Sequence, residues 1–255
     1  MSERGVSEWQ VFLLAVQFLT RLPVPRDLPF SDDLLIRATR YYPLVGGVVG
    51  AIGALVLLLM SQAVTMPVAV LLSIAATVFA TGAFHEDGLA DAADGLGGGL
   101  TRERALDIMR DSRIGTYGTV TLGLVLALKA AVLASFTAAD AAMAVLVMHM
   151  ISRMAAVSVI ATHDYARDVG AKFVAPTVSR DGFRFALLTT AVPVLAAMLW
   201  FGIGATFMAL LVAVLAAGVF RHIFMRKLQG YTGDCLGAVQ QFSELGLYLG
   251  LAIWL

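Results

Sequence analysis

Seven long apolar stretches constrain this chain more than any other feature of its sequence. They cover residues 42–64, 67–84, 115–136, 138–162, 183–201, 203–219 and 236–255. A helix needs about 20 largely apolar residues to cross a lipid bilayer, and helices satisfy their own backbone hydrogen bonds there. We therefore predict an all-α, polytopic bundle of about seven transmembrane helices.

Composition excludes several other classes of protein. Hydrophobic residues make up 59% of the chain and charged residues 14%, whereas soluble domains average about 45–50% and about 25%. The formal net charge is zero, which argues against a nucleic-acid-binding field. The only cysteine, Cys235, excludes a disulfide framework and a CxxC metal site. We treat residues 1–255 as one integral membrane domain.

The first apolar run, residues 9–19, is too short to span a bilayer and is followed by Pro23 and Pro25. No small-residue cleavage site follows it, so we do not expect a cleavable signal peptide. An amphipathic helix that lies at the membrane interface and ends before the prolines fits better.

The basic residues predict the orientation. With the N-terminus in the cytoplasm, every Lys and Arg except Lys129 and Arg153 falls on the inner side, as the positive-inside rule requires. The larger inner segments, 84–114, 163–183 and 220–235, would then form the active-site face.

Lys129 and Arg153 fall inside spans, where charge is costly and usually functional. We expect Lys129 to pair with an acid. Arg153, one helical turn after His149, is expected to face an acid or a substrate phosphate. A purely structural buried ion pair is the alternative for each.

The second apolar stretch runs directly into four acids, Glu86, Asp87, Asp91 and Asp94. If the helix continues, the last three share a face, where like charges repel. Hard carboxylate oxygens suit Mg²⁺, Mn²⁺ or Ca²⁺, and Mg²⁺ is typically shared with substrate phosphates. The glycines within 95–99 would allow phosphate oxygens to approach the backbone. A solvated helix end is the alternative.

A second acidic pair, Asp107 and Asp111, follows at helical spacing among basic residues. Arginines there could bind phosphate oxygens bidentately, and the candidates are Arg104, Arg110 and Arg113. A surface ion-pair network is the alternative for Asp107. Asp234, at the start of the last stretch, is either a ligand or substrate contact or a helix N-cap.

Glycines at 46, 47, 50 and 53 form a small-residue helix face. Such faces allow close helix packing within a chain or between subunits. A homo-oligomer through this face is therefore one expectation.

Four motifs together resemble a known family. They are FLTRLPVP at 18–25, HEDGLADAADGLGGG at 85–99, ERALDIMRDSRIGTYG at 103–118 and GDCLGAVQQFSE at 233–244. The chain resembles cobalamin synthase, the adenosylcobinamide-GDP ribazoletransferase family, over nearly its full length.

The resemblance implies a Mg²⁺-dependent transferase of the bacterial inner membrane that works from the cytoplasmic side. It would join adenosylcobinamide-GDP and α-ribazole, or its 5′-phosphate, and release GMP. This is the last step of cobalamin nucleotide-loop assembly. On this interpretation the metal ligands are Glu86, Asp87, Asp91, Asp94 and Asp111, and the residues that bind substrate are Arg104, Arg110, Arg113, Arg153 and Asp234.

The chain is more distantly similar to the CDP-alcohol phosphotransferases. Asp91, Asp94 and Gly95 match the opening of their signature, and Asp107 with Asp111 matches its closing spacing. By analogy with that family, Asp111 is expected to act as the base, and Asp94 shares the catalytic cluster. The Ala-Arg pair of the signature is replaced here by two glycines, and its last glycine by Glu103.

Two other functions remain open at this point. One is a CDP-alcohol phosphotransferase of phospholipid synthesis. The other is a cation transporter, which would place acids near the bilayer midplane or show an inverted repeat. The main acids lie instead at span ends on one side, and this favours an enzyme.

Overall fold

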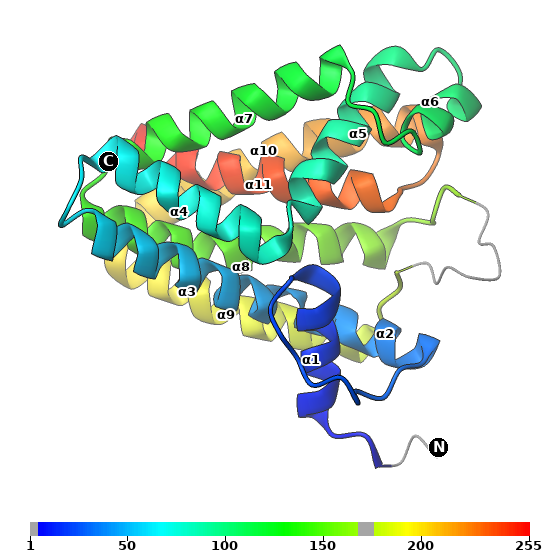
Figure 1. Cartoon of the computed structure of the whole chain (residues 1–255), viewed down its shortest axis with the longest axis horizontal. Helices are drawn as coiled ribbons and strands as arrows, with labels where there is room; N and C mark the ends of the chain where they lie inside the picture. Colours follow the sequence, from blue (N-terminus) through cyan, green and yellow to red (C-terminus); the bar gives the residue numbers. More distant parts are fainter. Residues whose placement is uncertain (1–4, 168–175) are drawn as a thin grey trace.

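The computed structural model describes residues 5–167 and 176–255. The predicted all-α architecture is confirmed, since these ranges contain helices and no strand (Figure 1). The helices are α1 (Glu8–Leu19), α2 (Asp32–Ala38), α3 (Tyr42–Met60), α4 (Met66–Thr81), α5 (Phe84–Gly98), α6 (Arg102–Ile108), α7 (Thr116–Ala134), α8 (Ala138–Thr162), α9 (Arg180–Phe201), α10 (Ile203–Leu228) and α11 (Gly233–Trp254), with a 3₁₀ turn at Thr39–Tyr41.

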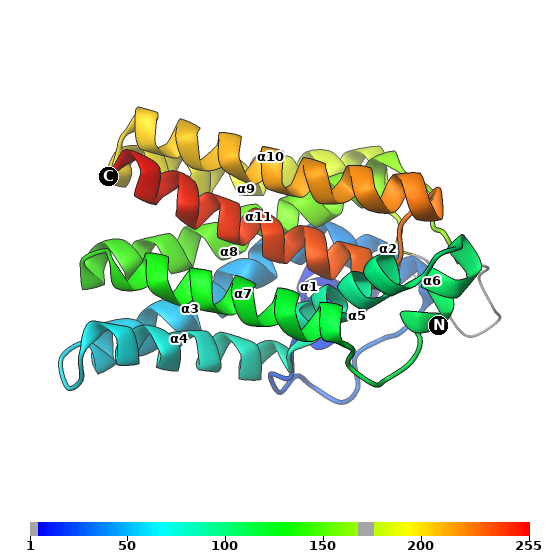
Figure 2. The same cartoon turned by 90° about the horizontal axis from the view of Figure 1, so that it is seen from above.

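The long helices run side by side along one axis. Figures 1 and 2 show this arrangement for α3, α4 and α7 to α11, whereas α2, α5 and α6 gather at one end of the bundle. We call this the site end. The C-terminus lies at the opposite end. The described parts of the predicted inner segments therefore meet at one end.

Length and hydropathy identify the helices that could span a bilayer. All seven predicted stretches are helical, but within the described residues five helices are each long and apolar enough to span: the α2–α3 unit, α7, α8, α9 and α10. The pair α4 and α5 qualifies only as a unit and is bent by 88°. The last predicted span, α11, is 22 residues long and carries several buried polar side chains.

The bend between α4 and α5 is produced by two consecutive residues with left-handed backbone. Gly82 has φ of 65° and Ala83 has φ of 59°. Glycine adopts this conformation without steric cost, whereas in alanine it brings the Cβ atom into unfavourable contact with the backbone. A Cβ on Gly82 would lie 2.6 Å from Nε of Arg21, and the Arg21 N–H donates to the Ala80 carbonyl oxygen at 2.8 Å. The N-terminal segment thus packs directly on the bend.

The glycine face of α3 packs inside the molecule. A Cβ on Gly46 would lie 2.2 Å from the His149 carbonyl oxygen, and one on Gly50 would lie 2.7 Å from that of Leu146. The face is therefore filled by α8, with backbone against backbone. The expectation of an oligomer through this face is wrong, because α8 leaves no room there for a second copy.

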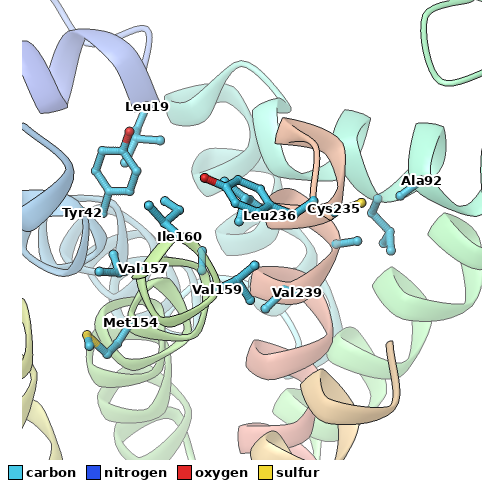
Figure 3. Packing of buried hydrophobic residues seen from close by; sticks show 14 of the residues in the cluster. Leu19, Tyr42, Ala92, Met154, Val157, Val159, Ile160, Cys235, Leu236 and Val239 are labelled. Atoms are coloured by element: carbon cyan, nitrogen blue, oxygen red, sulfur yellow. The ribbon is translucent and has the colours of Figure 1, made fainter. Parts of the chain in front are cut away.

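The core near the site end joins helices that are distant in sequence. Leu19, Tyr42, Ile160 and Leu236 belong to α1, α3, α8 and α11 and pack into one buried cluster (Figure 3). The predicted N-terminal helix is confirmed as α1. It buries one face and exposes 65% of Trp9, which is the amphipathic pattern expected at a membrane interface.

Candidate active site

The acidic stretch continues as helix α5, as predicted, and lies against the first turns of α11. Glycine allows this close approach: a Cβ on Gly88 would lie 3.1 Å from Cα of Asp234, and one on Gly237 would lie 3.0 Å from the His85 carbonyl oxygen. Because these two backbones nearly touch, an acid of the central motif and an acid of the C-terminal motif reach the same space.

That space is a cavity of about 260 Å³, which we call the Asp87 cavity. Its charged lining comprises Asp87 from α5, Arg153 from α8, Arg167 from the segment after α8, and Asp234 from α11. Arg167 Nη2 lies 2.7 Å from Asp234 Oδ2. The structure thus brings together three predicted site residues, Asp87, Arg153 and Asp234, and adds Arg167, which was not singled out from the sequence.

Asp234 does not cap α11. The N-cap is Thr232, whose hydroxyl accepts from the Cys235 N–H at 3.3 Å and also donates to Asp234 Oδ2 at 3.2 Å. The N-cap alternative for Asp234 is therefore wrong, and its carboxylate lines the cavity.

Asp91 lies one helical turn beyond Asp87. The negative charges of Asp87, Asp94 and Asp234 all act on its carboxylate. Four acids that repel one another in this way favour a bound cation. Among the described residues, no three His, Cys, Asp or Glu side chains are placed so that they could hold one metal ion by themselves.

Asp94 lies about one turn beyond Asp91, on the face of α5 that the three acids were predicted to share, and it joins this helix to α7. Its carboxylate accepts from the Gly115 N–H at 2.6 Å and from the Gly118 N–H at 2.8 Å. A carboxylate at a helix N-terminus satisfies amides that have no partner within the helix. A Cβ on Gly118 would lie 2.4 Å from Asp94 Oδ2, so only glycine fits there.

Asp94, Arg104, Asp107, Asp111 and Arg113 line a second and more open cavity of about 290 Å³, the Asp111 cavity. Arg113 Nη2 lies 2.5 Å from Asp111 Oδ2, and this guanidinium lowers the pKa of Asp111 to about 2. Of the predicted metal ligands, Asp87 therefore lines one cavity, and Asp94 and Asp111 line the other. Arg110 is exposed and lines neither cavity.

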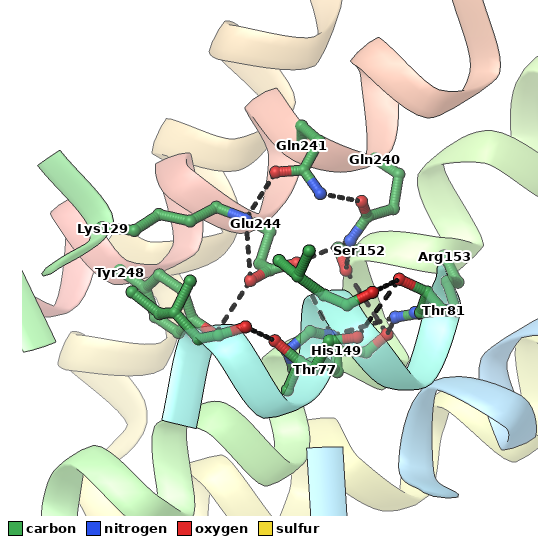
Figure 4. A network of polar contacts seen from close by, with 12 residues as sticks. Thr77, Thr81, Lys129, His149, Ser152, Arg153, Gln240, Gln241, Glu244 and Tyr248 are labelled. Atoms are coloured by element: carbon green, nitrogen blue, oxygen red, sulfur yellow. Dashed lines mark hydrogen bonds and ion pairs between the residues drawn. The ribbon is translucent and has the colours of Figure 1, made fainter. Parts of the chain in front are cut away.

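A buried polar network joins α7, α8 and α11 inside the bundle (Figure 4). Lys129 Nζ lies 2.9 Å from Glu244 Oε1 and donates to Gln241 Oε1 at 2.6 Å. Gln241 in turn donates to Glu86 Oε1 at 2.8 Å. The expected acid partner of Lys129 is thus confirmed as Glu244.

The same carboxylate holds the α8 side of the network. Gln240 donates to Glu244 Oε2 at 2.6 Å, and His149 Nδ1 lies 3.6 Å from that oxygen. Arg153 Nη1 lies 3.1 Å from His149 Nδ1, so the predicted pair on α8 is confirmed and faces this acid. Through it the network reaches the Asp87 cavity.

Sequence reasoning did not assign Gln240, Gln241 or Glu244, although all three lie in the motif at 233–244. The signal was present, because an acid inside an apolar span requires a partner. Glu86, a predicted metal ligand, accepts from Gln241 through Oε1, and its Oε2 is buried without a hydrogen-bond partner in the described part of the chain.

The chain was compared with known families and proteins. A family model described as cobalamin-5-phosphate synthase matches residues 11–252. A protein of Ralstonia nicotianae is 47% identical over 246 residues, 94% of each chain, and one of Shewanella amazonensis is 43% identical over 252 residues, 96% of each chain. A Vibrio cholerae protein is 42% identical over 253 residues, which are 96% of this chain and 94% of its own. All three are named adenosylcobinamide-GDP ribazoletransferase. No solved structure matches.

Proposed function

This chain belongs to the cobalamin-5-phosphate synthase family, and from that membership we propose that it is a Mg²⁺-dependent adenosylcobinamide-GDP ribazoletransferase of the bacterial inner membrane. The acceptor is α-ribazole or its 5′-phosphate, and GMP is the second product. The family makes it a transferase, and full-length similarity favours this activity over the CDP-alcohol and cation-transport alternatives.

One observation carries the assignment of the site. Two carboxylates, Asp87 and Asp234, and two guanidiniums, Arg153 and Arg167, line one cavity. Transfer from a diphosphate depends mainly on positioning and on neutralising charge, and this set offers ligands for both a cation and phosphate oxygens.

The donor set fits Mg²⁺ held jointly with substrate. Mg²⁺ is typically bound by one or two carboxylates plus substrate phosphates, and Asp87 and Asp234 line the same cavity. Asp87 and Asp91 lie on one face of α5, and Asp234 faces Asp87 across the cavity, where Arg167 pairs with it. We assign these three acids to the metal. When bound, it would neutralise charge on the diphosphate.

In the proposed reaction, a hydroxyl oxygen of the acceptor attacks the cobinamide-linked phosphorus. A P–O bond forms there as the bond to the bridging oxygen breaks, and that oxygen leaves with GMP. The hydroxyl proton passes to a carboxylate of the Asp87 cavity, Asp87 or Asp234. Asp111 is less suited, because a carboxylate whose pKa is about 2 is a weak base at neutral pH.

The arginines divide between the two cavities. Arg153 and Arg167 would bind phosphate oxygens of a substrate in the Asp87 cavity. Arg104 and Arg113 line the Asp111 cavity and would meet the guanylate end of the donor. Asp94 would act indirectly, since it holds the start of α7 against α5.

Single-turnover release of GMP from adenosylcobinamide-GDP and α-ribazole phosphate, with and without Mg²⁺, tests this function. We expect Asp87→Asn and Asp234→Asn to slow release by about 10²-fold or more, and Asp111→Asn to slow it less. Asp181→Asn is the matched control, since that side chain is 90% exposed on α9 and pairs with the neighbouring Arg184. No release by the wild type with any divalent metal would contradict the function. Equal losses in Asp111→Asn and Asp87→Asn would contradict the choice of cavity.

A further inference from the structure

The Asp87 cavity has a second, apolar end formed by aromatic rings. Phe18, Tyr42 and Phe84 line it together with Leu19 and Leu236. The Phe18 and Tyr42 rings are nearly parallel, 12° apart in plane with centroids 6.1 Å apart. Phe84 meets Phe18 edge to face at 5.6 Å. These rings come from three separate segments and converge on one space.

Two of the rings are incompletely packed. Phe18 is 40% exposed and Phe84 is 41% exposed, although both belong to a cavity that runs into the protein. Flat aromatic faces in such a position suit a flat aromatic ligand, because offset or edge-on ring pairs are favourable at centroid distances of about 4.5–7 Å.

The charged end has unused hydrogen-bond donors. Arg153 is only 2% exposed, and its Nε is buried without a hydrogen-bond partner within the described residues, as is Nε of Arg167. A buried donor without a partner costs free energy, and guanidinium groups bind phosphate well. An anionic group at this end would pair with the guanidinium groups of both arginines, which line the cavity.

The size of the cavity limits what can fill it. Its volume of about 260 Å³ lies near the lower limit for small-molecule sites, roughly 300 Å³. A corrin macrocycle is far too large. A nucleoside phosphate with one bicyclic base has the right size, the right apolar surface and the right charge.

Given the proposed function, on which this step rests, we infer that the Asp87 cavity is the acceptor site. The flat apolar base of α-ribazole lies among Phe18, Tyr42 and Phe84, and its 5′-phosphate lies against Arg153 and Arg167. The ribose between them brings its hydroxyls to Asp87 and Asp234. The corrinoid stays outside the cavity and presents only its diphosphate.

Acceptor discrimination provides the test. KM is measured for α-ribazole and for α-ribazole 5′-phosphate at saturating adenosylcobinamide-GDP, in purified protein. We expect Arg167→Gln to raise KM for the phosphorylated acceptor by about 10-fold or more, and to change KM for α-ribazole much less. Arg184→Gln, an exposed arginine on α9, is the matched control, and Arg153→Lys is a second variant with its charge retained.

The aromatic end is tested with Phe84→Leu. We expect KM to rise for both acceptors by the same factor, about 2- to 10-fold, with KM for adenosylcobinamide-GDP unchanged. Phe79→Leu, at a 79% exposed ring of α4, is the control. Equilibrium dialysis of α-ribazole 5′-phosphate in the absence of adenosylcobinamide-GDP should show that Phe84→Leu weakens its binding by the same factor.

Two results would overturn the inference. One is a rise in KM for the donor with no change for either acceptor. The other is phospholipid that co-purifies with the wild type and is lost from Phe84→Leu while acceptor KM stays constant, since the cavity would then hold lipid. A wild type that does not consume α-ribazole at all would instead refute the proposed function, while binding by dialysis would still report on this site.

Discussion

At the scale of single residues, the buried pair of Lys129 and Glu244 joins α7 to α11. Both side chains are about 5% exposed or less, and a charge inside a span requires a partner. Glu244 also accepts from Gln240 and Tyr248, so its oxygens are fully used. The pair holds Gln241, which in turn holds Glu86 on α5.

Replacing either Lys129 or Glu244 alone should therefore lower the free energy of unfolding more than replacing both. We expect Lys129→Met alone, or Glu244→Gln alone, to lower the free energy of unfolding by about 3–5 kcal/mol, because each leaves buried polar groups unpaired. The double variant Lys129→Met/Glu244→Gln should recover part of this loss. Thermal unfolding of the purified protein measures the cycle, and purely additive losses would contradict the pairing.

At the scale of helices, the bend between α4 and α5 directs the acids. Two left-handed residues turn the chain by 88°, so that α5 crosses the site end instead of prolonging α4. The hydrophobic pattern predicted the end of the span at Phe84 and the continuing helix. It did not predict the angle, which depends on backbone torsions at two residues and on Arg21 packed against them.

Substitutions at the two bend residues, Gly82 and Ala83, should shift the melting temperature in opposite directions. Ala83→Gly should raise the melting temperature and increase the free energy of unfolding by about 0.5–1 kcal/mol. Glycine adopts a positive φ without the steric cost that alanine has there. Gly82→Ala should lower it, because the added Cβ meets the Arg21 side chain as well as the unfavourable φ. Thermal unfolding decides this, and shifts of the same sign would contradict the bend as described.

Helix α1 is attached through a pH-sensitive cluster. Glu8 accepts hydrogen bonds from Tyr41, Arg37 and Arg40, and these partners, Tyr41 first, lower the pKa of Glu8 below its ordinary 4.5. A lowered pKa in the folded state stabilises the fold above the unfolded value, and that contribution is lost as pH falls through the folded value. It is small, at most about 1 kcal/mol, since Glu8 is 58% exposed and screened by water.

Glu8→Gln should therefore weaken the docking of α1 near neutral pH. Its effect should shrink as the pH falls below about 4.5 and vanish once Glu8 of the wild type is protonated. Hydrogen exchange of the α1 amides, compared between wild type and variant across this range, provides the measurement. A difference that grows towards acid pH would show that another group controls α1.

At the scale of the whole molecule, the bundle keeps its chemistry at one end. Both cavities and the bend lie with α5 and α6, whereas the opposite end carries short connections such as that between α3 and α4 (Figures 1 and 2). The distribution of basic residues predicts that the site end faces the cytoplasm.

Single-cysteine labelling tests this orientation. Cys235 is fully buried, so the parent protein should not react and acts as the control. Gln62→Cys, between α3 and α4, should react with a membrane-impermeant maleimide in spheroplasts. Ser112→Cys, between α6 and α7, should react only after the membrane is permeabilised. The reverse pattern would invert the topology.

The sequence alone determined the all-α class of fold, the approximate position of each long apolar helix and the need for an acid partner to Lys129. These properties follow from local hydrophobicity and charge, because the bilayer acts on each segment separately. The family motifs were also readable, since they are contiguous in the chain.

Only the tertiary structure decided which of these residues act together. It separated Asp87 from Asp111 into different cavities, joined Asp87 to Asp234 and Arg167, and identified Glu244 as the partner of Lys129. It also showed that the glycine face of α3 is filled by α8. The contact between Glu86 and Gln241 joins positions 155 residues apart. Such contacts depend on how helices pack and bend, and a linear pattern of hydrophobicity carries no information about either.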